Sequence, residues 1–228
     1  TSIITTAYTE LFGVQSYIVK GVRQSTKKSQ GKSNYFQPGA ILQMEVYHNE
    51  LKNLQFVKDF QWACVYQKIF FDVTHNAVAT YMIELLQHCL KEPESHPELF
   101  DFIEEALLLT DKSNHVFIAN MPLYFTLQLA SRLGFQIQND TIAKAEVLDL
   151  HEGVFLNEMP LHPNYVAGDI AGIISKLLLS KNFEEASKLE MNRTMRQEVM
   201  QALQLFLQLH INNYGEMRSV GVLQELFA

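Results

Sequence analysis

The first 66 residues alternate apolar and polar side chains in the manner of β-strands. The clearest case is 41–48, where Leu42, Met44 and Val46 alternate with polar or amphipathic neighbours. This period of two is typical of a sheet with one buried face. Runs of β-branched and aromatic residues predict two earlier strands and one later, long or bent strand. These three strands are predicted over residues 2–9, 14–22 and 54–66.

From about residue 71 the apolar period lengthens to that of helices, with spacings of three and four. The first such stripe consists of Val78, Tyr81, Met82, Leu85, Leu86 and Cys89. Further helices are predicted over residues 98–109, 116–133, 169–179 and 192–210, with a short one over 184–189. Pro122 either opens or kinks its helix, and Gly134 is suited to cap that helix. Residues 136–167 follow neither period and are expected to be irregular.

The two periods predict an α+β multidomain protein. We expect an N-terminal β-barrel of the OB type (an OB-fold) in residues 1–70, followed by a mostly α-helical domain in residues 71–228. A barrel of this type has five strands, whereas the pattern supplies four. Thr1 also leads directly into a strand-like run. Both observations predict that the chain begins inside the barrel domain and lacks its first strand.

The composition is that of an ordinary globular protein, because 47% of the 228 residues are hydrophobic and 19% are charged. No apolar run approaches the roughly 20 residues that cross a bilayer, so we expect a soluble protein with no membrane partner. Two cysteines, Cys64 and Cys89, are too few for a disulfide framework or a four-cysteine zinc site. Both are expected to pack as small apolar side chains in the reducing cytoplasm.

The net charge of −7 conceals two parts of opposite sign. Residues 1–72 contain eight Lys and Arg against five Asp and Glu, which leaves ten against twenty for residues 73–228. Residues 11–44 contain no acid, and their cations are Lys20, Arg23, Lys27, Lys28 and Lys32. Such a cluster attracts polyanions, phosphate above all. A flexible, solvated loop is the competing interpretation of the same charges.

Catalytic motifs are missing from the sequence. It contains no phosphate-binding or dinucleotide-binding glycine pattern, no G-x-S-x-G and no H-E-x-x-H. His151, Glu152, Glu158 and His162 are candidate metal ligands, but their spacing matches no standard site. We therefore predict a protein that is not an enzyme and has no catalytic residue, cofactor or metal. A metal-dependent hydrolase with its site in 136–167 stays open as an alternative.

Aromatic side chains are interleaved with the cations of the predicted barrel. OB barrels bind single strands through cations that neutralise phosphates and exposed rings on which bases stack. Tyr17 and Phe36 are expected in the core, whereas packing and base stacking are equally open for Tyr35 and Tyr47. The predicted nucleic-acid-binding residues are Lys20, Arg23, Lys27, Lys28, Lys32, Tyr35 and Tyr47. An adaptor whose barrel binds protein instead of DNA is a third interpretation.

A series of short motifs runs through essentially the whole chain in a fixed order. The motifs are V-K-G-V-R at 19–23, Y-F-Q-P at 35–38, T-Y-M-I-E-L-L at 80–86, P-E-L-F at 97–100 and R-L-G-F at 132–135. A basic, serine-containing loop separates the first two motifs. This ordered series closely resembles the RecO family of DNA repair and recombination mediators.

The resemblance implies a two-domain, non-enzymatic protein that binds single- and double-stranded DNA and promotes annealing of complementary strands. It implies association with RecR and, indirectly, with RecA, which displaces the single-stranded-DNA-binding protein during repair. It also implies that the acidic C-terminal tail of that protein docks on this one, and that the protein acts at the nucleoid. Carried over by position, the DNA-contacting residues are the five cations named above.

Two features depart from the family pattern. Many relatives have a four-cysteine zinc module after the L-G-[FY] segment, whereas residues 136–162 contain no cysteine here. We therefore expect packing, not zinc, to hold this segment. Some relatives also open the central helix with a basic residue that docks the acidic tail. The matching residues here, Met121, Pro122 and Leu123, are uncharged.

Overall fold

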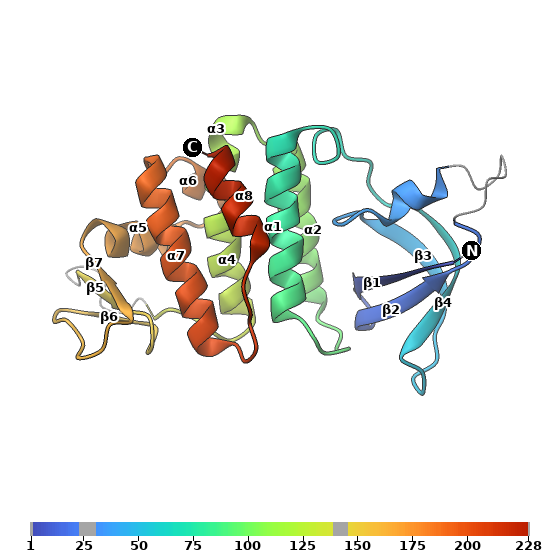
Figure 1. Cartoon of the computed structure of the whole chain (residues 1–228), viewed down its shortest axis with the longest axis horizontal. Coiled ribbons are helices and arrows are strands. Elements are labelled where there is room, and N and C mark those ends of the chain that lie inside the picture. Colours follow the sequence, from blue (N-terminus) through green and yellow to red (C-terminus); the bar gives the residue numbers. More distant parts are fainter. Residues whose placement is uncertain (1, 23–30, 139–145, 228) are drawn as a thin grey trace.

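The computed structural model describes residues 2–22, 31–138 and 146–227, except for the side chain of Val116 (Figure 1). Strands come first and helices follow, which confirms the predicted α+β architecture of an OB-fold barrel and a mostly helical domain. The strands of the barrel are β1 (Ile3–Thr9), β2 (Gly13–Val19), β3 (Leu42–Tyr47) and β4 (Leu54–Trp62). A short 3₁₀ helix, η1 (Lys32–Phe36), precedes β3. The predicted domain boundary at residue 70 lies between β4 and the first long helix and stays a prediction.

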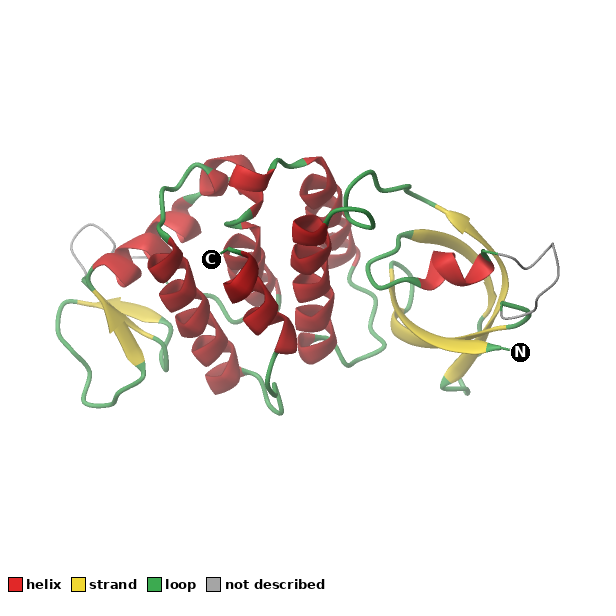
Figure 2. Ribbon diagram, turned by 45° about the horizontal axis from the view of Figure 1, so that its top comes forward, coloured by secondary structure: helices red, strands yellow, loops and turns green. Residues whose placement is uncertain are grey.

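The barrel sheet has the strand order β1-β2-β4-β3. β1 and β2 form the predicted antiparallel hairpin, β2 runs parallel to β4, and β4 pairs antiparallel with β3. Figure 2 shows these strands curving into a ring. In the described part of the chain, β1 and β3 are the outer members of this order. The expected additional first strand stays a prediction.

A β-bulge changes the direction of the side chains along β4. Val57 lies opposite Val46 and Asp59 lies opposite Glu45, so that Lys58 is an extra residue without a partner position on β3. An extra residue reverses which positions face the interior beyond it. Phe56 therefore faces outward before the bulge, whereas Phe60 faces inward after it. The strand also ends at Trp62, so the predicted extension to residue 66 is wrong.

The helical domain contains most of the predicted helices. They are α1 (Val73–Cys89), α2 (Pro97–Lys112), α3 (His115–Ile118), α4 (Met121–Arg132), α5 (Asp169–Leu179), α6 (Phe183–Ser187), α7 (Arg193–His210) and α8 (Arg218–Leu226). α4 is almost entirely buried and is surrounded by α1, α2, α5, α6 and α7, so it forms the centre of the core. Pro122 opens α4, and Gly134 follows that helix with φ at +88°. The sequence pattern did not predict α8.

The segment expected to be irregular, 136–167, contains a small antiparallel sheet. Its strands are β5 (Val147–Asp149), β6 (Val154–Leu156) and β7 (Tyr165–Ala167), in the order β6-β5-β7. The buried Asp149 carboxylate accepts N–H groups of His151 and Glu152 and lies 3.1 Å from Nε2 of His162. The expectation of an irregular segment is therefore wrong for these strands. Residues 139–145 lie outside the described residues.

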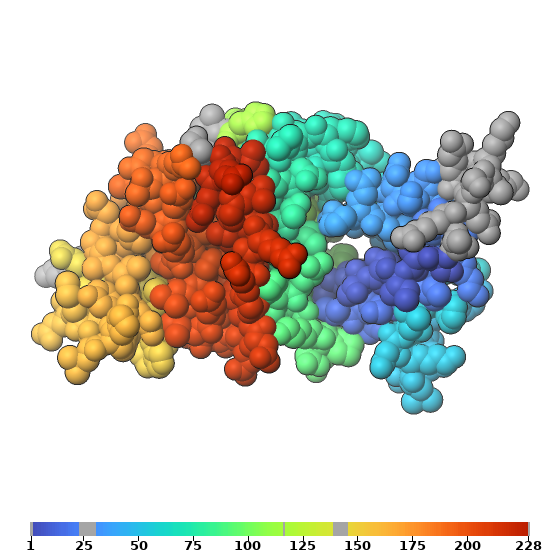
Figure 3. All heavy atoms as spheres, in the orientation of Figure 1, coloured from blue at the N-terminus to red at the C-terminus, as the bar shows by residue number. Residues whose placement is uncertain are grey.

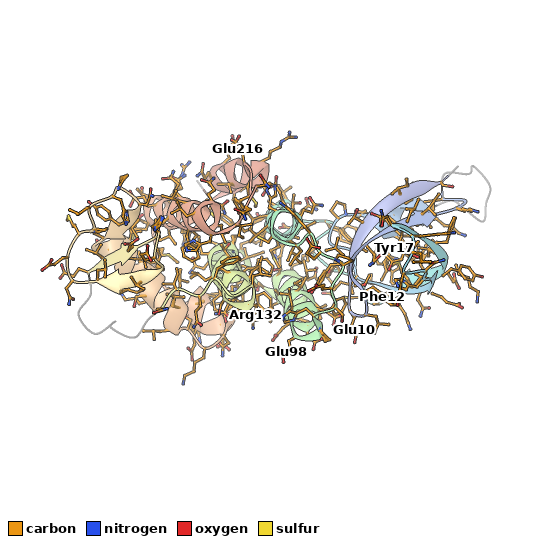
Figure 4. All side chains as sticks on the ribbon, turned by 90° about the horizontal axis from the view of Figure 1, so that it is seen from below. Glu10, Phe12, Tyr17, Glu98, Arg132 and Glu216 are labelled. Atoms are coloured by element: carbon orange, nitrogen blue, oxygen red, sulfur yellow. The ribbon has the colours of Figure 1, made fainter. Side chains whose placement is uncertain are left out.

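The β1–β2 hairpin meets the helical domain at the segment between α1 and α2. The ring of Tyr8 stacks on Phe100 with centroids 6.2 Å apart, and Ser95 Oγ donates to the carbonyl of Glu10 at 2.7 Å. Figure 3 shows that the two parts touch over a narrow area. In Figure 4, Glu10 and Phe12 lie on the barrel side of this junction and Glu98 on the helical side. No helix in the described part of the chain is long and apolar enough to cross a membrane.

Candidate nucleic-acid interface

The described cations of the predicted cluster lie at the two ends of one loop. Lys20 directly follows β2, and Lys32 is the first residue of η1; both side chains are exposed. Arg23, Lys27 and Lys28 lie between them, in residues 23–30, outside the described residues. Neither Lys20 nor Lys32 has a carboxylate within salt-bridge distance among the residues that the structure describes.

The outer-face group, formed by Lys20, Tyr47 and Phe56, lies on the solvent side of the barrel sheet. Tyr47 and Phe56 occupy opposite positions on β3 and β4, where side chains share one face. Tyr47 is 63% exposed and Phe56 is 38% exposed. Nζ of Lys20 lies 5.0 Å from the centroid of the Phe56 ring, within cation–π distance. The group therefore presents one positive charge beside two accessible rings.

Lys58, Glu45 and Asp59 carry the neighbouring charges on this face, and two of them form an ion pair. Lys58 forms an ion pair with Glu45, and this hydrogen bond raises the pKa of the lysine. Lys20 has no such partner, so its charge remains available to an external anion. The alternation of β3 predicted the exposure of Tyr47. Phe56 was missed because the bulge that places it outward is not visible in the residue pattern.

A second aromatic cluster joins η1 to the inner side of β4. The ring of Tyr35 stacks on Trp62 at 4.7 Å and meets the Phe60 ring edge-on at 5.2 Å. Phe36 also contacts Phe60, and Nζ of Lys32 lies 6.0 Å from the Phe60 centroid. Tyr35 is half-buried with one ring face against Trp62, so packing accounts for much of its position.

The structure divides the predicted site into two pairs. Lys20 lies with Tyr47 outside the sheet, and Lys32 lies with Tyr35 at η1. Their contact rings, Phe56 and Phe60, are four positions apart on β4, or roughly 13 Å at the rise of a strand. Tyr17 is buried, as expected, and burial raises the pKa of its phenol. The two pairs border the loop that contains the other three cations.

An apolar pocket with two arginines lies on the helical domain; we call it the arginine pocket. It is lined by Pro122, Leu123, Arg193, Arg196, Met200 and Leu223, among other residues of α4, α7 and α8. Nε of Arg196 donates to Oδ1 of Asn120 at 3.1 Å, and burial lowers the pKa of this guanidinium. Across the described ranges, neither arginine has a carboxylate partner. The sequence did not predict these two arginines, because the family pattern places its basic docking residue at the start of α4.

Candidate metal ligands converge at one place among the described residues, and it is not in 136–167. Ligand atoms of Asp72, His75 and His115 all lie within 4.8 Å of one another. His151 instead pairs with Glu152 at 2.8 Å, and His162 pairs with the buried Asp149. The described part of 136–167 therefore contains no three-ligand group that would support the hydrolase alternative.

Comparison with known proteins agrees with both halves of this architecture. Family models described as Recombination protein O N terminal and Recombination protein O C terminal match residues 1–64 and 71–218. A DNA repair protein RecO of Bacteroides fragilis is 29% identical over all of this chain and 93% of its own length. A DNA repair protein RecO of Flavobacterium psychrophilum is also 29% identical, over all of this chain and 92% of its own length. A third, from Azobacteroides pseudotrichonymphae, is 24% identical over 96% of this chain and 89% of its own length. The chain therefore belongs to the RecO family of DNA repair proteins.

Proposed function

We propose that this chain is a non-enzymatic recombination mediator of the cytoplasm that acts on nucleoid DNA. Its barrel binds single- and double-stranded DNA and promotes annealing of complementary strands. Together with RecR, it helps RecA to load on DNA covered by the single-stranded-DNA-binding protein. The observation that carries the proposal is the outer-face group, where Lys20 lies beside two accessible rings and has no carboxylate partner among the described residues. The sequence segment 23–30 contains three further cations.

Annealing requires two polyanions to approach each other, and the barrel lowers the cost of that approach. Lys20, Lys32 and the loop cations neutralise phosphates of one or two strands and release their counterions. Tyr47 and Phe56 offer ring faces on which bases of either strand stack without sequence preference. No covalent bond is made or broken, so the chemistry is binding alone.

The dependence of single-stranded DNA affinity on salt tests the role of the cations. Contacts from three to five cations give a slope of log K against log salt of roughly −2 to −3.5. The Lys20→Ala/Lys32→Ala double variant should lose about 1.4 of this slope and roughly 10- to 30-fold in affinity at about 0.1 M salt. Fluorescence anisotropy of a labelled oligonucleotide measures both quantities.

Lys176→Ala/Lys181→Ala removes two exposed charges of the helical domain and is the matched control. A barrel variant that keeps the full slope contradicts the assignment.

Base stacking predicts a different response, because a ring contact releases no counterion. Tyr47→Ala should weaken single-stranded DNA binding by about 1–3 kcal/mol and leave the salt slope unchanged. Phe71→Ala is the control, because Phe71 is a highly exposed ring outside the barrel sheet. The same anisotropy titrations measure the effect. A changed slope, or equal losses in both variants, argues against stacking at Tyr47.

We further propose that the arginine pocket docks the acidic C-terminal tail of the single-stranded-DNA-binding protein. Two guanidiniums without carboxylate partners complement an acidic peptide, and the apolar walls accept its apolar side chains. This location supplies the positive charge that Met121, Pro122 and Leu123 do not. Recruitment through the tail would bring the barrel to DNA on which that protein is bound.

Binding of a labelled tail peptide to the whole chain tests this docking. Arg193→Ala should weaken binding roughly tenfold, the equivalent of about 1.4 kcal/mol. Arg193 is preferred to Arg196 because Arg196 holds the buried Asn120, whereas the contact of Arg193 with the carbonyl of Gln224 is exposed. Arg218→Ala, an exposed arginine at the start of α8, is the matched control. Unchanged affinity of the Arg193 variant rules out the arginine pocket as the docking site.

A further inference from the structure

Three side chains that favour metal coordination meet where the chain enters the helical domain. Asp72 caps α1 and accepts the backbone N–H of His75 at 3.0 Å, which brings the two side chains to the same side of the helix start. His115, the first residue of α3, faces them, with Nε2 3.7 Å from Oδ2 of Asp72. The imidazole rings of His75 and His115 have centroids 5.2 Å apart. The group thus joins two segments that are 40 positions apart in the sequence.

The contacts of the buried His75 ring direct its Nδ1 atom toward the Asp72 carboxylate. The side chain is 1% exposed, and Nε2 lies 3.0 Å from the carbonyl oxygen of Ser113. A carbonyl can only accept, so Nε2 carries the proton and donates it. Nδ1 lies 2.5 Å from Oδ1 of Asp72, which when ionised is also only an acceptor. The ring is therefore held with Nδ1 against the Asp72 carboxylate, which Nε2 of His115 also approaches.

We propose that Asp72, His75 and His115 bind a Zn²⁺ ion through a carboxylate oxygen, Nδ1 and Nε2, with water as the fourth ligand. Three protein ligands that supply nitrogen and carboxylate oxygen atoms, with water as the fourth ligand, are typical of zinc sites. Ligand atoms around tetrahedral zinc lie roughly 3.3 Å apart, and one ligand atom from each of the three residues already lies within 4.8 Å of the other two. His115 is 66% exposed and free to adjust its position.

The hydrogen bond from His75 to Ser113 is the kind of outer contact that zinc ligands use. A metal-bound histidine donates its other ring N–H to a carbonyl or carboxylate, which fixes the tautomer and the ring orientation. Here Nε2 of His75 makes that contact with the carbonyl of Ser113. A bound ion would link the start of α1 to the α2–α3 turn and so stiffen the entry to the helical domain. This site is separate from the segment 136–162, where many relatives have a cysteine zinc module.

Zinc titration of the whole, untagged chain after treatment with a chelator tests the site. Isothermal titration calorimetry should give one equivalent of Zn²⁺. His115→Ala should weaken the binding at least tenfold, because even the loss of an outer contact costs 10- to 100-fold. Asp72→Asn should do the same, although asparagine keeps an oxygen that caps α1. Zinc at about 100 times its Kd should raise the Tm of the unsubstituted chain by roughly 5–10 °C and leave that of His115→Ala unchanged.

His151→Ala is the matched control, because it removes another exposed histidine that lies beside a carboxylate. Its zinc affinity should equal that of the unsubstituted chain. Loss of zinc binding in His151→Ala but not in His115→Ala would move the metal to the β5–β6 region and overturn the proposal. Absence of a stoichiometric zinc site in the unsubstituted chain would also overturn it.

Discussion

At the scale of the residue, one carboxylate ties the segment that leaves the barrel to the helical domain. Asp111, buried near the end of α2, accepts the backbone N–H groups of Gln67, Lys68 and Ile69 at 2.8–3.1 Å. Asp111→Asn keeps the size but removes the charge and replaces one acceptor oxygen with a donor. We expect this variant to lose about 2–3 kcal/mol of unfolding free energy, measured by urea denaturation. Asp101→Asn, at an exposed carboxylate of the same helix, should lose almost none.

The stability that Asp111 contributes depends on pH with a defined sign. Burial alone would raise its pKa, but the three backbone donors outweigh burial and hold the pKa below its usual range. A carboxyl group with a lowered pKa stabilises the fold above its unfolded pKa of about 3.9, and this contribution is lost as the pH falls through the folded value. The difference between the parent chain and Asp111→Asn should therefore be constant at about pH 6–8 and shrink below about pH 4. A difference that grows on acidification contradicts this interpretation of Asp111.

At the scale of the element, periodicity identified the long helices and the barrel strands because one face of each is buried. The pattern around Tyr47 placed that ring outside, but Phe56 required the bulge at Lys58, which depends on pairing with β3. The strands β5 to β7 are three residues each, too short to show a period. Asp111 lies beyond the helix predicted over 98–109, and partners more than 40 positions away leave no local signal. The basic cluster was visible from composition, whereas the arginine pocket requires three helices to come together.

Helix α8 was missed because its N-terminus is capped by another helix. Met217 precedes it and has no capping side chain, whereas Glu84 of α1 accepts the N–H groups of Arg218 and Ser219 at 2.9 and 2.8 Å. Glu84→Gln loses the charge and one acceptor oxygen. We therefore expect the free energy that protects the α8 amides against hydrogen exchange to fall by about 1 kcal/mol. Hydrogen exchange of the α8 amides should accelerate roughly fivefold while α7 is unchanged. Glu105→Gln, at an exposed carboxylate of α2, is the control, and equal exchange in both variants contradicts capping by Glu84.

At the scale of the whole molecule, the position of the barrel depends on a close contact of backbones at the junction. Gly13 has φ at +60°, and a Cβ atom there would lie 2.2 Å from the carbonyl oxygen of Glu94. Gly21 has a similar φ of +73°, and no atom of the described residues lies within 4 Å of the same position. Both alanine variants therefore carry the backbone cost of a positive φ, about 1–2 kcal/mol, but only Gly13→Ala also forces the two parts away from each other.

The separation that Gly13→Ala imposes should be measurable as a change of shape. Small-angle X-ray scattering should give a larger radius of gyration for Gly13→Ala than for Gly21→Ala, and protease should cut residues 92–96 faster. The Tyr8–Phe100 stack and the hydrogen bond from Ser95 to Glu10 lie at the same junction. Both should therefore be lost together with the backbone contact between Gly13 and Glu94. If the two variants scatter identically, the barrel is held by contacts other than the one at Gly13. If only Gly13→Ala expands, this glycine fixes where the barrel sits relative to the arginine pocket. The proposed coupling between DNA binding and tail-peptide binding should then weaken in that variant.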